Sequence, residues 1–137
     1  MAIISTEAIV LRSIDHRETS KIAFFFTKDK GRVTGVLKGI RKDPRKFGSS
    51  LEKFSVNDIV YYEYRNSDIH LVSACDMKGF FAGIRQEGRL ITAADYGAEL
   101  VNRIMPPEQP NPEVFRLLLD YLLALDVERN LYDVDRL

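Results

Sequence analysis

The sequence contains few cysteines and histidines, the residues that form disulfides and bind zinc. Its 137 residues include a single cysteine, Cys75, so an internal disulfide is excluded, and no Cys/His cluster has zinc spacing. No apolar stretch is long enough to span a bilayer. The N-terminus also lacks the basic stretch that precedes the apolar run of a signal peptide. We therefore expect a soluble cytoplasmic protein in a reducing compartment, with no membrane association.

Patterns typical of catalysis are missing as well. Segment 38–48 contains glycine and lysine but lacks the Gly-Lys-Ser/Thr ending of a phosphate-binding loop. His16 stands among charges in a turn, and His70 alternates with apolar residues on a strand without an evident partner. Cys75 is expected to be buried filler rather than a nucleophile. Because the Asp and Glu residues show no paired spacing, we expect no catalytic residue, no metal site and no enzymatic activity.

The zero net charge conceals an asymmetry between the two halves of the chain. Residues 1–53 contain twelve Lys/Arg against six Asp/Glu, whereas residues 54–137 contain eight against fourteen. Such a split predicts an anionic partner for the N-terminal half only.

The N-terminal half has the pattern of a small β-barrel. Gly31 is placed to form a turn between two strands, and Gly35, inside a strand, predicts a bulge or bend that lets a small sheet curl. Short turns and one long loop favour a closed five-stranded barrel. The expected strands are 3–12, 21–27, 32–38, 56–64 and 69–75.

The C-terminal half changes to helical spacing. A short helix is expected within 79–88, and Thr92 with Asp95 resembles a capping box that begins the next helix. Its expected buried stripe comprises Ala93, Tyr96, Gly97, Leu100, Val101 and Ile104. Pro106 should end this helix, and Asn111 should cap the last one.

The last helix, within 114–125, is apolar on nearly every side. A helix of this kind must be buried all round, yet only about a dozen residues follow it. We therefore expect another subunit or further chain to cover it, so the sequence is expected to be part of a longer protein.

A strongly basic loop is the main functional signal. Five cations stand within nine residues and are accompanied by a single acid, Asp43. Lysine and arginine in such a cluster bind phosphate, so the loop predicts a polyanion site. The candidate DNA-binding residues of the loop are Lys38, Arg41, Lys42, Arg45 and Lys46.

Other interpretations of this region remain open. The loop could simply be solvated, and Phe47 could either stack on a base or, as its surroundings favour, anchor the loop to the barrel. Lys30 and Arg32 flank the preceding turn and extend the candidate site. Weaker candidates are Arg12, Arg17 and Lys21.

In combination, these segments resemble the N-terminal region of the RecO family of DNA repair and recombination mediators. The similarity is best over residues 4–76. It is carried by Thr6–Glu7, Ile9–Leu11, Glu18, Ser20–Ile22, Thr27, Gly31, Lys38–Gly39, Arg41, Phe47–Gly48, Leu51–Glu52 and Phe54. Asp43 and Pro44 interrupt the basic loop, which is a departure from the family pattern.

The resemblance implies a five-stranded OB-fold, expected at 1–77, followed by the start of a helical domain, expected at 78–137 and incomplete. It implies binding to single- and double-stranded DNA, strand annealing, help in recombinase loading, and RecR and single-strand-binding protein as partners. The DNA contacts would involve Lys38, Arg41 and Lys42. Many family members carry a four-cysteine zinc site, which would lie in a missing C-terminal part, so no cofactor is expected here.

The sequence therefore predicts a non-enzymatic DNA-binding mediator. The alternative is an OB-type protein–protein interaction module that docks an acidic partner through its basic loop. A third alternative is a nuclease or ligase accessory factor with a hidden metal site. Such a site would need a cluster of carboxylates, which the sequence does not show.

Overall fold

The computed structural model describes the backbone of residues 2–136 and the side chains of residues 2–127. Five strands form a closed barrel in the order β1-β2-β3-β5-β4, in which β3 pairs with β5 in parallel and the other pairs are antiparallel. The predicted five-stranded OB-type barrel is confirmed. The strands are β1 (Ala2–His16), β2 (Ser20–Thr27), β3 (Gly31–Leu37), β4 (Val56–Glu63) and β5 (Ile69–Gly79).

The barrel interior follows the period of two that the strands show in sequence. Along β3 the residues alternate between buried and half-buried, and Val33 and Leu37 point into the same core as Phe25 and Tyr61. Alternate side chains of each strand therefore fill the barrel, while the others form its outer surface.

The residues that interrupt the regular strand pairing lie on β1 and β5. The register of β1 against β2 shifts between Val10 and Arg12, and that of β4 against β5 shifts between Val60 and Tyr61. Of the bulge or bend predicted at Gly35, the bulge does not form. Gly35 pairs in regular register with β2, and a Cβ there would lie 2.5 Å from Cγ2 of Val72, so close packing explains this glycine.

The turn between β2 and β3 depends on Gly31. Its φ is +71°, which favours glycine, and an added Cβ would collide with the carbonyl of Gln109. The predicted hairpin is thus confirmed, and the same glycine lets the connection between the two long helices approach β3.

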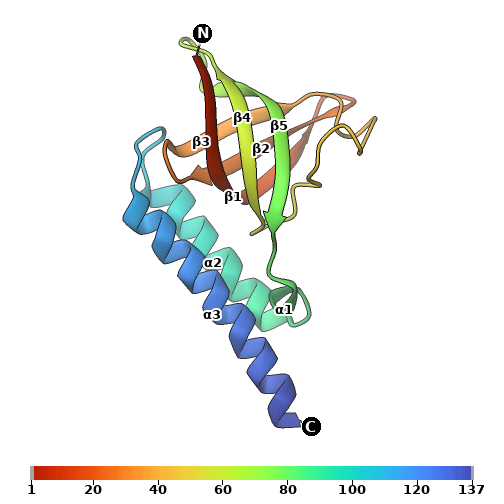
Figure 1. Cartoon of the computed structure of the whole chain (residues 1–137), viewed down its shortest axis with the longest axis vertical. Helices are drawn as coiled ribbons and strands as arrows, with labels where there is room; N and C mark the ends of the chain where they lie inside the picture. Colours follow the sequence, from red (N-terminus) through yellow and green to blue (C-terminus); the bar gives the residue numbers. More distant parts are fainter. Residues whose placement is uncertain (1, 137) are drawn as a thin grey trace.

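Three helices lie together beside one end of the barrel, with the two long ones side by side (Figure 1). They are α1 (Ala82–Arg85), α2 (Gly88–Ile104) and α3 (Pro112–Arg136). Phe26 of β2 meets Phe115 of α3 with ring centroids 6.1 Å apart. The shared core combines Ile9, Leu11, Phe26 and Phe54 with Ile84, Leu90, Ala94, Ala98, Phe115, Leu118 and Leu122.

Two expectations for α2 are wrong. The helix begins at Gly88, so Thr92 lies inside it and its hydroxyl donates to the Gly88 carbonyl at 3.0 Å instead of capping. Of the expected buried stripe, Tyr96 is 69% exposed and Ile104 is 65% exposed. The buried face is formed by Leu90, Ala94 and Ala98. Small alanines let the helix approach the barrel closely, which a count of apolar residues does not reveal.

Helix α3 begins as predicted, and part of its apolar surface is exposed. Oδ1 of Asn111 accepts a hydrogen bond from the Val114 amide at 3.1 Å, which confirms the cap. Phe115, Leu118 and Leu122 are buried, whereas Leu117 is 66% exposed and Leu123 is 51% exposed. Only one face of this helix packs on the rest of the described chain. Among the described residues, no helix is both long enough and apolar enough to cross a membrane.

Candidate nucleic-acid interface

The loop between β3 and β4 is held against the barrel by apolar anchors. Ile40, Phe47 and Leu51 are all at least nine-tenths buried and belong to the barrel core. The expectation that Phe47 anchors the loop is confirmed, and its ring is therefore not available to stack on a base. In Figure 1 this segment lies on the side of the barrel away from the α2–α3 connection.

Three cations of the basic loop project into solvent. Within the part of the chain whose side chains are described, Lys38, Lys42 and Arg45 form no side-chain hydrogen bond or ion pair. Asp43, the single acid, accepts a hydrogen bond from the Arg45 amide at 3.1 Å, and its carbonyl accepts one from the Lys46 amide at 3.0 Å. The acid shapes the turn, and in the part of the chain whose side chains are described it forms no ion pair with the loop cations.

The other two cations of the loop help to hold its shape. Arg41 donates through Nη1 to the Arg17 carbonyl at 3.0 Å, and its Nη2 lies 3.5 Å from Oδ2 of Asp15. Lys46 donates through Nζ to the Lys38 carbonyl at 2.7 Å. Both residues are exposed, and as loop-shaping groups they are less suited to simple charge-reversal tests.

The turn between β1 and β2 adds to this basic surface. Arg17 lies in that turn, and Lys21, at the start of β2, has its Nζ 3.9 Å from Oδ1 of Asp15. Asp15 is therefore shared between Lys21 and Arg41. The tertiary structure thus brings the weaker candidates Arg17 and Lys21 beside the loop.

Arg32 and Lys30 are not brought together with the loop. Lys30 lies in the turn before β3 and Arg32 at the start of β3, whereas the loop follows the end of this strand. Arg32 donates through Nε to the Met105 carbonyl at 2.5 Å and through Nη1 to Oδ1 of Asn102 at 3.4 Å, so it docks the end of α2. Lys30 lines a separate hollow near carboxylates that include Glu63 and Glu108.

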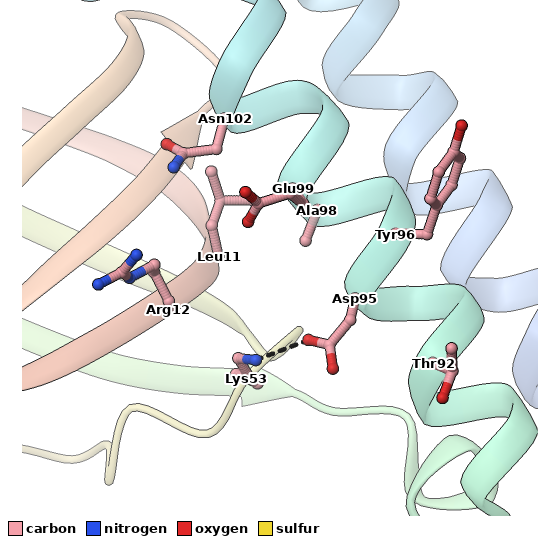
Figure 2. A pocket seen from close by; sticks show the side chains of 9 residues that line it. All are labelled: Leu11, Arg12, Lys53, Thr92, Asp95, Tyr96, Ala98, Glu99 and Asn102. Atoms are coloured by element: carbon pink, nitrogen blue, oxygen red, sulfur yellow. Dashed lines mark hydrogen bonds and ion pairs between the residues drawn. The ribbon is translucent and has the colours of Figure 1, made fainter.

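A hollow of about 410 Å³ lies between β1 and α2 (Figure 2). Nζ of Lys53 lies 2.6 Å from Oδ1 of Asp95 across it, and Glu99 contributes a second carboxylate to its wall. Arg12 lies at the barrel side of this hollow, with its guanidinium carbon 4.9 Å from the ring centre of Phe24. The charges of the hollow are mixed, so it is not suited to a polyanion.

His70 has a partner that sequence reasoning missed. Its ring is 1% exposed, Nδ1 accepts a hydrogen bond from the Tyr64 amide at 3.1 Å, and Nε2 lies 2.6 Å from Oε1 of Glu108. His70 and Glu108 are 38 positions apart in the sequence, so no local pattern predicts their contact. Among the residues whose side chains are described, no group of three or more His, Cys, Asp or Glu is placed to hold a metal ion.

Two buried groups of the barrel core, Cys75 and Tyr61, have raised pKa values. Cys75 is 1% exposed, as expected for buried filler, and desolvation by burial raises its pKa to about 12. Burial also raises the pKa of Tyr61, with further contributions from Glu63 and Glu108. Both groups are therefore neutral at physiological pH.

The connectivity of the barrel, with its exposed cationic loop and appended helices, defines a class: an OB-type barrel joined to a helical segment. A family model described as "Recombination protein O N terminal" matches residues 1–81, and one described as "Recombination protein O C terminal" matches residues 85–135. The chain belongs to the RecO family.

Curated relatives support this membership. The chain is 41% identical to the DNA repair protein RecO of Geobacter metallireducens over 123 residues, which is 88% of this chain and 49% of that protein. It is 32% identical to the DNA repair protein RecO of Salinibacter ruber over 126 residues, covering 92% of this chain and 48% of the relative. The chain spans about half the length of the curated relatives it matches.

Proposed function

We propose that this chain is the DNA-binding part of a recombination mediator in DNA repair. It would bind single- and double-stranded DNA through the basic loop, promote annealing and assist recombinase loading, with RecR and single-strand-binding protein as partners. The observation that carries the proposal is a set of three outward-facing cations on an anchored loop, Lys38, Lys42 and Arg45, which have no partner among the residues whose side chains are described. Membership of a family whose relatives are named DNA repair proteins supports it.

The mechanism we propose is electrostatic and involves no bond chemistry. Cations that neutralise phosphates release condensed counterions, which favours binding and makes affinity depend on salt. Lowering the repulsion between two polyanions also allows complementary strands to approach, while their bases stay free to pair. Anchors such as Phe47 keep the loop ordered, so less conformational entropy is lost when DNA binds.

The decisive experiment compares two charge-reversal variants in oligonucleotide binding. Lys38→Glu/Lys42→Glu/Arg45→Glu reverses the three unpartnered cations. The control, Lys28→Glu/Arg103→Glu/Arg116→Glu, reverses three exposed cations outside the basic loop, of which Arg103 and Arg116 form ion pairs within their helices. Circular dichroism checks that both variants stay folded. Fluorescence anisotropy of a labelled single strand, and separately of a duplex, is measured at several salt concentrations.

We expect the loop variant to bind at least tenfold more weakly than the control. If three phosphate contacts are lost, the slope of log affinity against log salt should become less steep by about 2 for a single strand, at about 0.7 per phosphate. Equal losses in the two variants, or a flat salt response of the unaltered protein, would contradict a DNA site on the loop.

An interaction module that docks an acidic partner is the second candidate. Exposed apolar side chains on α2 and α3, including Leu100, Ile104 and Leu117, favour a role in protein contacts. In this case the loop variant would keep its affinity for DNA and lose binding to an acidic protein partner, for which RecR is the first candidate to test. Parallel titrations with DNA and with purified RecR distinguish the two candidates.

A further inference from the structure

A hollow of about 320 Å³ lies where the β2–β3 turn, the β4–β5 turn and the α2–α3 connection meet. Its charged lining residues, which come from these connections and from the end of β4, are Lys30, Glu63, Arg65, Asp68 and Glu108. The hollow is separate from the basic loop, because Lys30 precedes β3 whereas the loop follows the end of that strand. A ligand in this hollow would therefore leave the loop free.

The hollow carries a small surplus of negative charge, with three carboxylates against two cations. Glu63 forms no side-chain hydrogen bond or ion pair within the part of the chain whose side chains are described. Glu108 uses Oε1 for the contact with Nε2 of His70 at 2.6 Å, and its Oε2 contacts no polar group of the same part of the chain. Carboxylate oxygens of both residues are therefore available to one cationic ligand.

Main-chain and side-chain contacts fix the position of Glu108. Its amide donates to the Arg32 carbonyl at 2.9 Å, and its φ is +57°, which is uncommon for a residue other than glycine. Nδ1 of His70 accepts the Tyr64 amide at 3.1 Å, so the ring proton lies on Nε2 and is donated to Glu108. The carboxylate is thus positioned before a ligand arrives, which lowers the entropy lost on binding.

Tyr61 lies at the floor of the hollow. It lines the hollow and is 0% exposed, and its hydroxyl has no hydrogen-bond partner among the described residues. Its ring stacks on His70 with ring centroids 5.4 Å apart. Burial raises the pKa of Tyr61, and the charges of Glu63 and Glu108 raise it further, so both carboxylates act on this hydroxyl. A buried hydroxyl without a partner costs free energy, which a hydrogen-bonding ligand would recover.

A guanidinium group matches these acceptors best. It is planar and always charged, and its five N–H donors can reach several oxygen acceptors at once. Tyr64, which is 36% exposed, adds an aromatic ring to the lining, and guanidinium groups stack on such rings. A metal ion fits less well, because the residues with described side chains include no group of three or more His, Cys, Asp or Glu placed to hold one.

The open side of the hollow favours a ligand that is carried by a protein. Its wall on the β4–β5 turn includes Arg65, Ser67 and Asp68, which are all exposed. An arginine side chain of a partner can enter the hollow while the main chain of the partner lies against this turn. A free small molecule would lack these additional contacts.

We propose that this hollow binds the guanidinium group of an arginine side chain presented by a protein partner, with Glu63 and Glu108 as carboxylate acceptors and the Tyr61 hydroxyl as a further acceptor at the floor. The site goes beyond the proposed function, because it lies apart from the basic loop and recognises a cation instead of a polyanion. It also gives Glu63 and Tyr61 a role that DNA binding does not explain.

The test compares a short arginine peptide with its neutral counterpart. An acetylated and amidated pentapeptide with arginine between two glycines on each side is titrated into ¹⁵N-labelled protein. In the control peptide citrulline replaces arginine, which keeps the shape and removes the charge. We expect saturable shifts of the Tyr64 and Glu108 amides with the arginine peptide, no shift of the Lys42 amide in the basic loop, and about tenfold weaker binding of the citrulline peptide.

Two substitutions measure the individual acceptors. Glu63→Gln removes the charge and keeps the shape, so it should weaken binding of the arginine peptide about tenfold. Tyr61→Phe removes only the hydroxyl and should weaken binding about threefold. Glu18→Gln, in the β1–β2 turn outside the hollow, is the control and should bind as the unaltered protein does. Urea unfolding midpoints show whether the three variants retain the fold.

Each contrary result overturns a defined part of the inference. Equal affinities of the arginine and citrulline peptides, or full affinity of Glu63→Gln, would overturn the site. A lysine peptide that binds as tightly as the arginine peptide would overturn the choice of a guanidinium. Free arginine that binds more tightly than the peptide would overturn the protein partner. All titrations are made without DNA, so their failure leaves the basic loop as the proposed DNA site, and failure of the DNA site leaves them unaffected.

Discussion

Nε2 of His70, on β5, lies 2.6 Å from Oε1 of Glu108, in the connection between α2 and α3. This contact joins the barrel to the helices at a point where the main chain also pairs, because the Glu108 amide donates to the Arg32 carbonyl at 2.9 Å. Arg32 itself reaches the Met105 carbonyl. The α2–α3 connection is therefore fastened to the start of β3 and β5 by side-chain and main-chain hydrogen bonds.

Glu108→Ala should destabilise the protein by about 1–3 kcal/mol, because the buried His70 ring loses the partner of its Nε2. Glu108→Gln keeps an acceptor oxygen and should have a smaller effect. Urea unfolding at pH 7 measures both, with Glu18→Ala in the exposed β1–β2 turn as the control. If Glu108→Ala unfolds at the same urea concentration as the control, the contact does not contribute to stability.

Gly97→Ala should weaken the packing of α2 on α3. A Cβ at this position would lie 2.6 Å from Cε2 of Tyr121, whose hydroxyl is fixed by donating to the Ala93 carbonyl at 2.7 Å. The clash should outweigh the gain in helix propensity of about 1 kcal/mol, giving a net loss of about 1–2 kcal/mol.

Gly88→Ala is the matched control for this substitution. It also lies in α2, but an added Cβ meets nothing within 4 Å, so stability should be unchanged or increased. Thermal unfolding followed by circular dichroism compares the two variants. Similar melting temperatures would contradict the tight contact between Gly97 and Tyr121.

Tyr61→Phe should leave stability at pH 7 unchanged or increase it by up to about 1 kcal/mol. Among the described residues, the buried Tyr61 hydroxyl has no hydrogen-bond partner, so its removal relieves a desolvation penalty. Tyr96→Phe, at a mostly exposed position, is the control and should be neutral.

The same variant should change the response to alkaline pH. Burial raises the pKa of Tyr61 above its ordinary value of 10.0, so the unfolded chain loses this proton first and the free energy of unfolding falls as pH rises above about 10. Urea unfolding at pH 8 and pH 11 should show a smaller loss for Tyr61→Phe than for the unaltered protein. Equal losses of unfolding free energy in Tyr61→Phe and in the unaltered protein would argue against a neutral, buried Tyr61.

Cys75 should resist thiol reagents in the folded protein. Its side chain is buried and its pKa is raised to about 12, so the reactive thiolate is scarce and shielded at pH 8. Reaction with a colorimetric disulfide reagent should occur only in denaturant. Ser50→Cys, at an exposed position in the β3–β4 loop, should react rapidly without denaturant. Fast labelling of Cys75 in native buffer would show that the barrel opens readily.

Local patterns predicted the strands and turns well because those features depend on neighbouring residues. Alternation along β3, the turn at Gly31 and the Asn111 cap are all set within a few positions of the chain. The misplaced start and buried face of α2 show the limit of such patterns. Its register was decided by the close approach of Ala94 and Ala98 to the barrel, which depends on residues far away in sequence.

The sequence by itself determined a small barrel with a cationic loop, because alternating burial, turn glycines and clustered charge are local properties. Tertiary structure decided which cations remain unpartnered. It placed Arg32 under the end of α2, set Arg17 beside Arg41, and left Arg12 on the ring of Phe24. These outcomes depend on how the strands close and where the helices dock, and therefore on contacts between residues that are distant in the chain.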